Sequence, residues 1–486
     1  MTQEPAAMER LSSGSPAFDR ILGGGLPLRS LTVVAGEPGA GKTLFALQTL
    51  FNLTSQGRKC LYFTTLSEPA VKLAHHMQKF TFFNEKVIGK ELVFVDLGSA
   101  IREHDADAAL DAIVKRIERE EPAVVVIDSF KAMRSMLGDE ASVRTFVYDL
   151  AVHVAGWGAA TLFIGEYLDH EIMQFPEFAI ADGILRFSTS RQELTSVRMI
   201  EVLKLRGADC VTGRHFFEIG VGGLTFYPRV RGPEANGHGA MSGPVDRASS
   251  GVAGIDDMLG GGLPRSSSTV VQGGTGTGKT LLGLQFLIEG ARRGEPGILF
   301  TLEETPDQLR GIAQGFGWDL GDLEKRGLLW ICHRSPVELS TDAFLNWARQ
   351  RVEEVGARRA VLDSLTSMAL GVPSERRFKE LVYAIAKHFR ALGVTFNMNM
   401  EVAELLGTGQ LSGQGISFAA DNMIQLRYVE VDGKLERGIS ILKARGIRHT
   451  TEVHRVDVSK KGVEVGSPFK GLRGVLTGLP TPLDPK

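Results

Sequence analysis

Between an apolar run and a helical pattern, the chain reads Gly36-Glu37-Pro38-Gly39-Ala40-Gly41-Lys42-Thr43. A glycine, four residues and then Gly-Lys-Thr is a pattern that binds nucleotide phosphates. The pattern returns as Gly273-Gly274-Thr275-Gly276-Thr277-Gly278-Lys279-Thr280, 237 residues later. This repeat predicts two nucleotide sites in two similar halves.

Each copy follows a strand-like run and precedes a helical one, so backbone N–H groups and a helix N-terminus converge on one point. Glycine is required where the backbone turns tightly against an anion. We expect Lys42 and Lys279 to reach the β- and γ-phosphates and Thr43 and Thr280 to ligate Mg²⁺. A chance glycine-rich turn is the alternative, and two matches in the same context make it weak. The predicted nucleotide-binding residues are Gly36, Gly39, Ala40, Gly41, Lys42, Thr43 and Leu44, then Gly273, Thr275, Gly276, Thr277, Gly278, Lys279, Thr280 and Leu281.

The repeat extends beyond the loops at the same offset. Gly23-Gly24-Gly25-Leu26-Pro27 returns as Gly260-Gly261-Gly262-Leu263-Pro264. A period this long indicates duplicated domains rather than a solenoid. The expected organisation is a flexible N-terminus (1–9), a first ATPase domain (10–227), a Gly- and Pro-rich linker (228–247), a second ATPase domain (248–478) and a flexible tail (479–486).

The composition is that of a globular protein. Of 486 residues, 43% are hydrophobic and 23% are charged, and the net charge is −2. Without a basic bias we expect no standing nucleic-acid binding. Three scattered cysteines form no zinc or disulfide pattern and fit a reducing cytosol. No signal peptide or membrane-spanning run is apparent, so we expect a cytoplasmic protein with no membrane partner.

Apolar runs alternate with amphipathic stretches in each half, as in Val124-Val125-Val126-Ile127 and Ala360-Val361-Leu362. Strands interleaved with helices predict the α/β class, with a mainly parallel sheet covered by helices in each domain. Asp128 and Asp363 end these two runs, 85 and 83 residues after the loop threonines. We therefore expect both aspartates on the Mg²⁺ side of their sites, although a lone Asp often only caps a strand.

The acids expected beside the γ-phosphate differ between the halves. The second half carries Glu303 and Glu304 after a strand, where a carboxylate can orient or deprotonate an attacking group. The first half places Leu66-Ser67 there, or Glu68 after a one-residue shift. We infer that the first site binds ATP and hydrolyses it slowly; the alternative is that Glu68 alone suffices. Glu166 and Glu401 also end strands and rank below Glu303 and Glu304.

These tandem loops, the Glu-Glu pair and the two Asp-Ser pairs resemble the KaiC family, double-domain ATPases of the RecA superfamily. Lys204-Leu205-Arg206-Gly207 and Lys443-Ala444-Arg445-Gly446 add to the resemblance, which covers roughly residues 10 to 478. It implies two RecA-like domains and a two-tiered homohexamer. It also implies that Lys204, Arg206, Lys443 and Arg445 reach the γ-phosphate of a neighbouring subunit.

The chain departs from the family where the clock proteins phosphorylate an adjacent Ser and Thr. Ser417 matches the serine, but Phe418 replaces the threonine and cannot accept phosphate. Ser417 is thus a candidate for a single phosphoacceptor with Glu303 as base, or an ordinary loop serine. The short Pro-rich end argues against a KaiA-like partner, whereas a KaiB-like partner is not excluded.

We predict an ATP-binding, ATP-hydrolysing, ring-forming KaiC-like regulator that uses Mg²⁺, with serine autokinase activity as a secondary hypothesis. One alternative is a DNA-dependent ATPase of the RecA type, a recombinase or helicase relative. Another is a scaffold stabilised by ATP with negligible turnover. The sequence names neither the output pathway nor the partner.

Overall fold

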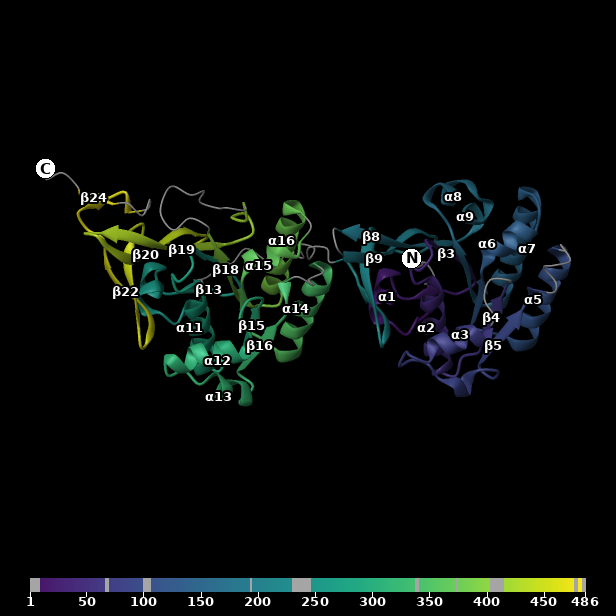
Figure 1. Ribbon diagram of the computed structural model, residues 1–486, viewed down its shortest axis with the longest axis horizontal. Coiled ribbons are helices and arrows are strands. Elements are labelled where there is room, and N and C mark those ends of the chain that lie inside the picture. The colour runs from purple at the N-terminus through teal and green to yellow at the C-terminus, as the bar shows by residue number, and fades with distance from the viewer. Residues whose placement is uncertain are drawn as a thin grey trace, which may run out of the picture. The chain divides into compact units, whose positions relative to one another are not determined.

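The computed structural model describes residues 9–65, 70–98, 106–192, 195–229, 246–336, 341–372, 374–402, 415–475 and 480–482. The chain divides into two compact units, one up to Arg229 and one from Val230 on. Each unit is built on one nine-stranded sheet (Figure 1).

The first unit places its phosphate-loop strand, β3, inside the sheet, whose order is β11-β10-β9-β8-β3-β7-β6-β4-β5. Strands β8, β3, β7, β6, β4 and β5 are parallel, and β9 to β11 continue the sheet in antiparallel fashion. The elements are β1 (Arg10–Leu11), α1 (Pro16–Ile21), β2 (Leu26–Pro27), β3 (Ser30–Gly36), α2 (Lys42–Thr54), β4 (Cys60–Thr64), α3 (Ala70–Met77), η1 (Glu85–Val87), β5 (Leu92–Asp96), α5 (Ala106–Glu120), β6 (Val124–Asp128), α6 (Phe130–Met136), α7 (Glu140–Trp157), β7 (Ala160–Glu166), α8 (Asp169–Gln174), α9 (Pro176–Ile180), β8 (Gly183–Gln192), β9 (Thr195–Leu205), β10 (Arg214–Gly220) and β11 (Gly223–Tyr227).

The second unit repeats this plan around β14, with the order β16-β15-β17-β18-β14-β19-β20-β21-β22. Its elements are β12 (Arg247–Ala248), α10 (Ala253–Met258), β13 (Leu263–Pro264), β14 (Ser268–Gly273), α11 (Lys279–Arg292), β15 (Gly297–Thr301), α12 (Pro306–Gly315), α13 (Leu320–Lys325), β16 (Leu329–His333), α14 (Thr341–Val355), β17 (Arg359–Asp363), α15 (Leu365–Leu370), α16 (Glu375–Ala391), β18 (Thr395–Glu401), β19 (Asn422–Val431), β20 (Lys434–Ala444), β21 (His454–Ser459), β22 (Gly462–Pro468), β23 (Leu472–Arg473) and β24 (Thr481–Pro482).

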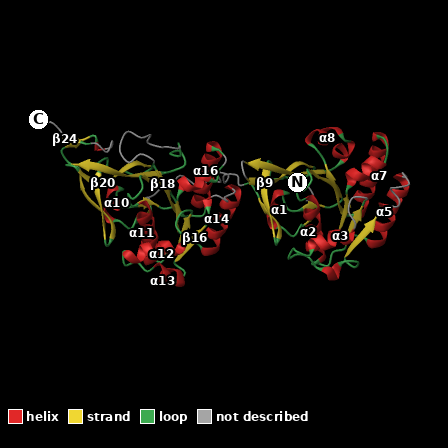
Figure 2. Cartoon of the chain, viewed as in Figure 1, coloured by secondary structure: helices red, strands yellow, loops and turns green. Residues whose placement is uncertain are grey.

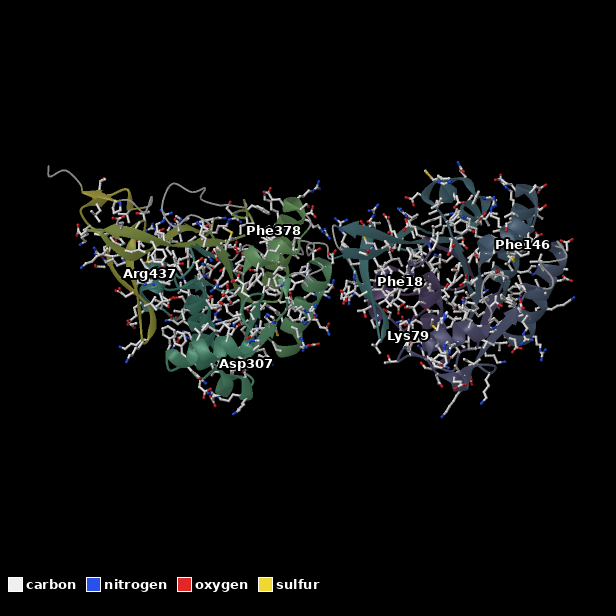
Figure 3. All side chains as sticks on the ribbon, viewed as in Figure 1. Phe18, Lys79, Phe146, Asp307, Phe378 and Arg437 are labelled. Atoms are coloured by element: carbon white, nitrogen blue, oxygen red, sulfur yellow. The ribbon has the colours of Figure 1, made fainter. Side chains whose placement is uncertain are left out.

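Both faces of the parallel part of each sheet are covered by helices, as Figure 2 shows. Successive strand residues point to opposite faces, so Val34 packs with α1 and α2 while Val33 packs with α5 and α7. Phe18 lies in the first of these two cores (Figure 3). A strand buried on both sides is mostly apolar on both faces, which is why Val33, Val34 and Ala35 follow one another without a polar residue between them. The prediction of two mainly parallel α/β domains is confirmed.

Asp421 ties the start of β14 to α16 in the second unit. Its carboxylate accepts hydrogen bonds from the backbone N–H of Ser268 at 3.0 Å and from the Arg390 guanidinium. Burial alone would raise the pKa of Asp421, but the Ser268 hydrogen bond and the Arg390 charge lower it below its ordinary value. The Asp421 side chain is only 10% exposed, so these bonds are shielded from water.

We expect Asp421→Asn to reduce the unfolding free energy of the second unit by about 2 kcal/mol at pH 7, since bonds to a buried charge are lost. A depressed pKa means that the charge contributes above about pH 4 and that its contribution disappears as the pH falls below that value. Urea unfolding followed by tryptophan fluorescence from pH 7 to pH 2.5 measures this difference. A deficit that stays constant with pH would contradict the assignment.

No helix among the described residues is both long and apolar enough to cross a membrane.

Candidate nucleotide sites

Both phosphate loops have the predicted strand–turn–helix geometry. Helix α2 begins at Lys42 after Gly41, whose φ is 100°, and α11 begins at Lys279 after Gly278, whose φ is 106°. Residues other than glycine rarely adopt these backbone angles. A Cβ on Gly276 would also lie 2.9 Å from the Tyr428 hydroxyl. The glycines are therefore required by the backbone path.

The two loop lysines curl back over their own loops. Lys42 Nζ donates to the carbonyls of Gly36 at 2.9 Å and Glu37 at 2.7 Å, and Lys279 Nζ does the same to Gly273 and Gly274. Burial lowers the pKa of both lysines, while nearby carboxylates oppose the shift. Each ammonium is thus held at the mouth of its loop.

The strand-end aspartates lie beside the loop threonines, as the spacing predicted. Thr43 Oγ1 donates to Asp128 at 2.8 Å and Thr280 Oγ1 donates to Asp363 at 2.7 Å. Burial raises the pKa of Asp363, although the hydrogen bond from Thr280 acts in the opposite direction and lowers it. In the first unit Asp128 also accepts from the Tyr62 hydroxyl at 2.6 Å, a donor that no sequence pattern predicts.

Glu303 and Glu304 follow β15 at the same end of the sheet as Asp363. Glu303 accepts hydrogen bonds from Ser364 Oγ at 2.5 Å and from Ser367 Oγ. Glu304 is half-buried, and burial followed by the charge of Asp363 raises its pKa. Within the described part of the chain, Glu304 Oε2 is buried without a hydrogen-bond partner. Two carboxylates thus face the loop, one fixed by serines and one with an unused oxygen.

The corresponding stretch of the first unit lies partly outside the described residues, and Glu68 falls there. Thr64 pairs with Asp128 in register as Thr301 pairs with Asp363, so up to this point the two units match without a gap. Which residue follows as an acid in the first site stays a prediction.

The acids that end the strands next to the loops are held differently in the two units. Glu401 accepts from Thr275 Oγ1 at 2.6 Å, and its backbone N–H donates to Thr366 Oγ1 at 2.8 Å. In the first unit Pro38 replaces Thr275, and Lys131 replaces Thr366 at the third position after the aspartate. Glu166 therefore has neither hydroxyl beside it.

Lys204, Arg206, Lys443 and Arg445 lie at the opposite end of each sheet from their own loops. Lys204 is paired with Ile184, beside the start of β3, whereas the loop follows the end of β3 at Gly36. Lys204 Nζ donates to the carbonyls of Phe178 and Ala179, and Arg206 pairs with Asp182 at 3.5 Å.

The second unit repeats this placement. Lys443 is paired with Met423 near the start of β14, and Arg445 lies 4.0 Å from Asp421. No cation of these two motifs belongs to the phosphate site of its own unit.

Ser417 lies at the same end as Lys443. Lys443 Nζ donates to the carbonyls of Ser417 and Ala420, both at 2.6 Å. The neighbouring Phe418 is 46% exposed and stacks on Tyr383, with ring centroids 6.1 Å apart. Glu303, at the loop end of the sheet, is therefore not placed to act on Ser417 of its own chain.

Arg437 is a further residue at the second loop that sequence reasoning missed. From β20, where Figure 3 labels it, Arg437 donates through Nε to the Gly276 carbonyl at 3.3 Å, and its guanidinium lies over the Tyr428 ring. The sequence separation of 161 residues gave no signal, because antiparallel pairing of β19 and β20 brings Arg437 there.

A family model described as "ATPase: KaiC" matches residues 11–231 and again residues 248–470, so it accounts for both units. The chain belongs to the KaiC ATPase family. The predicted resemblance is confirmed, and this KaiC-family ATPase carries both copies of the phosphate loop inside the matched segments.

Similar proteins extend over almost the whole chain. A "Circadian clock protein KaiC3" from Synechocystis sp. is 30% identical over 490 residues, covering 98% of this chain and 96% of that protein. A "Circadian clock oscillator protein KaiC" from Thermostichus vulcanus is 29% identical, covering 99% and 93%, and one from Synechococcus elongatus is 28% identical, covering 98% and 93%.

The residues at each loop fit a Mg²⁺–nucleotide complex. Threonine hydroxyls and aspartate carboxylates are hard oxygen ligands of the kind that Mg²⁺ prefers. The described residues hold no group of three or more His, Cys, Asp or Glu able to bind a metal alone. Mg²⁺ would thus be held by Thr43 with Asp128, or Thr280 with Asp363, together with phosphate oxygens.

Proposed function

We propose that this KaiC-family ATPase forms a ring, hydrolyses ATP at sites shared between neighbouring subunits and works as a regulator read by a protein partner. One observation carries the proposal: each unit has a phosphate loop at one end of its sheet and a Lys-x-Arg motif at the other. The cations of these motifs can contact a nucleotide only if another copy of the chain binds that nucleotide. The ATPase domains of the proposal are residues 10–227 and 248–478.

A head-to-tail contact satisfies this arrangement. Heterologous contacts between identical chains close into a ring when the rotation allows it, and the two tiers then follow from the duplication. We propose a hexamer. Arg206 and Arg445 would stabilise charge on the transferring phosphoryl group of the adjoining subunit.

The two sites are proposed to work at different rates. When bound, Mg²⁺ neutralises charge on the β- and γ-phosphates. Glu303, fixed by Ser364 and Ser367, would orient the attacking water in the second site, and Lys279 would hold the phosphates. Aligned without a gap, the first site has Leu66-Ser67 at these positions, and we propose that it turns over more slowly.

Serine autophosphorylation in trans is the secondary proposal. Ser417 lies with Lys443 and Arg445 at the end that would face a neighbour's nucleotide. Mass spectrometry after incubation with Mg-ATP tests it, and an unmodified Ser417 would rule it out. The printed names of the relatives suggest a role in timing, but Phe418 prevents a two-residue cycle here.

The test of the main proposal is to measure particle size and phosphate release in parallel, with and without ATP. A hexamer that forms with ATP and releases phosphate supports it. A hexamer without phosphate release supports the scaffold alternative. Release that is stimulated by DNA with a steep salt dependence supports the alternative of a DNA-dependent motor.

Ser367→Ala is expected to lower turnover about fivefold with an unchanged KM, since one net hydrogen bond of about 1 kcal/mol to Glu303 is lost. Ser367→Thr keeps the hydroxyl and is the matched control. Steady-state phosphate release against ATP concentration measures both. Equal loss in the two variants would mean that packing, rather than the hydrogen bond, matters at this position.

A further inference from the structure

Lys131 is a cation at the first phosphate site with no counterpart in the second. It is the third residue after Asp128, the position that Thr366 occupies after Asp363. Its side chain lines a cavity of about 730 Å³ together with Lys42, Thr43, Asp128 and Glu166. The cavity therefore joins the phosphate loop directly to Lys131.

The ammonium of Lys131 is held at the wall of this cavity. It lies 2.8 Å from both carboxylate oxygens of Glu171 on α8 and 5.4 Å from the centre of the Tyr167 ring. The side chain is 34% exposed, so the pair is accessible to a competing anion. Glu171 also accepts from the backbone N–H of Leu168, the residue just before α8.

The position of Lys131 indicates which part of a bound nucleotide it would contact. Lys42 and Thr43 are placed for the β- and γ-phosphates, and Asp128 for the metal. Lys131 is the second residue of α6, the helix that follows Asp128, and it lines the same cavity as Lys42 and Thr43. One change accompanies it in the first unit, because Pro38 replaces Thr275. Relative to the second site, the first site thus gains a cation at the wall of its cavity.

We propose that Lys131 is a specificity-determining residue that binds the terminal phosphate of ATP at the first site and leaves Glu171 when it does so. An ammonium forms charge-assisted hydrogen bonds to phosphate, and ADP lacks the terminal phosphate. The first site then distinguishes ATP from ADP by a charge within the same chain. This inference rests on the proposed function, because it requires nucleotide at that site.

The test is a site-resolved titration of the full-length chain by hydrogen exchange. Protection of the peptide over residues 36–46 is followed against Mg-ATPγS or Mg-ADP concentration, and the peptide over 273–284 reports the second site in the same samples. Lys131→Thr, which installs the residue of the second unit, should lower the preference for ATPγS over ADP about tenfold at the first site only. Lys131→Arg keeps the charge and should keep most of the preference.

Two further variants separate charge at this site from general effects. Glu171→Gln removes the competing carboxylate and should raise the ATPγS preference about threefold. Lys115→Thr removes a lysine from an exposed ion pair with Asp111 on α5 and should change nothing. A structural role for Lys131 would instead weaken both nucleotides equally.

The outcomes are distinct. The inference is overturned if the first site of Lys131→Thr prefers ATPγS over ADP within twofold of the wild-type value. It is also overturned if this preference changes equally at the second site. If neither nucleotide protects residues 36–46 in the wild type, the proposed function itself fails for this site.

Discussion

Lys279→Ala is expected to lower ATP hydrolysis at the second site about a thousandfold, because the ammonium that stabilises charge on the β- and γ-phosphates is lost. Lys279 Nζ already lies over the loop, bound to the Gly273 and Gly274 carbonyls. Total phosphate release should fall to the smaller contribution of the first site. Lys42→Ala should leave most of the release intact.

Phosphate release from Lys42→Ala, Lys279→Ala and the double variant, each measured beside particle size, separates the two sites. The double variant defines the background. If Lys42→Ala removes most of the release and Lys279→Ala little, the assignment of the faster site is wrong. If neither variant changes release or assembly, neither loop uses ATP.

Arg445→Ala should also lower second-site turnover about a thousandfold, the effect of losing an arginine that stabilises the transferring phosphoryl group. The arginine is far from its own loop, at the end of the sheet where Asp421 lies. The loss should therefore appear in the site of the neighbouring subunit.

Mixing the two defective chains tests this directly. A second-site pocket in a mixed ring is complete when an Arg445→Ala chain supplies the loop and a Lys279→Ala chain supplies the arginine. Random 1:1 mixing makes roughly a quarter of the second-site pockets complete. Second-site phosphate release should therefore recover to about a quarter of the wild-type value. Mixing Arg445→Ala with an Arg445→Ala, Lys279→Ala double variant is the control and should not recover. Absence of recovery in rings shown to be mixed would contradict shared sites.

Local patterns of the sequence were sufficient for the loops, the metal-side aspartates and the mainly parallel sheets. In these cases a strand, a turn and a helix follow one another within about ten residues, so spacing determines geometry. The Thr43–Asp128 and Thr280–Asp363 contacts followed because parallel strands end at one edge of the sheet.

Contacts made by the antiparallel extension and by single side chains were not predictable in this way. Arg437 reaches Gly276 only because β20 folds back along β19. Tyr62 reaches Asp128 across β4 and β6, and Leu299 stands at the matching place in the second unit. Such long-range pairs depend on strand order, which periodicity alone does not encode.

The separation of each Lys-x-Arg motif from the loop of its own unit has a consequence for stoichiometry. If the cations act across subunit boundaries, an open row of n chains completes n − 1 pockets in each tier, and only a closed circle completes all n. Closing the circle then creates one additional pocket in each tier at the seam. If ATP binds more tightly to complete pockets, mass action favours the closed ring over open rows of chains.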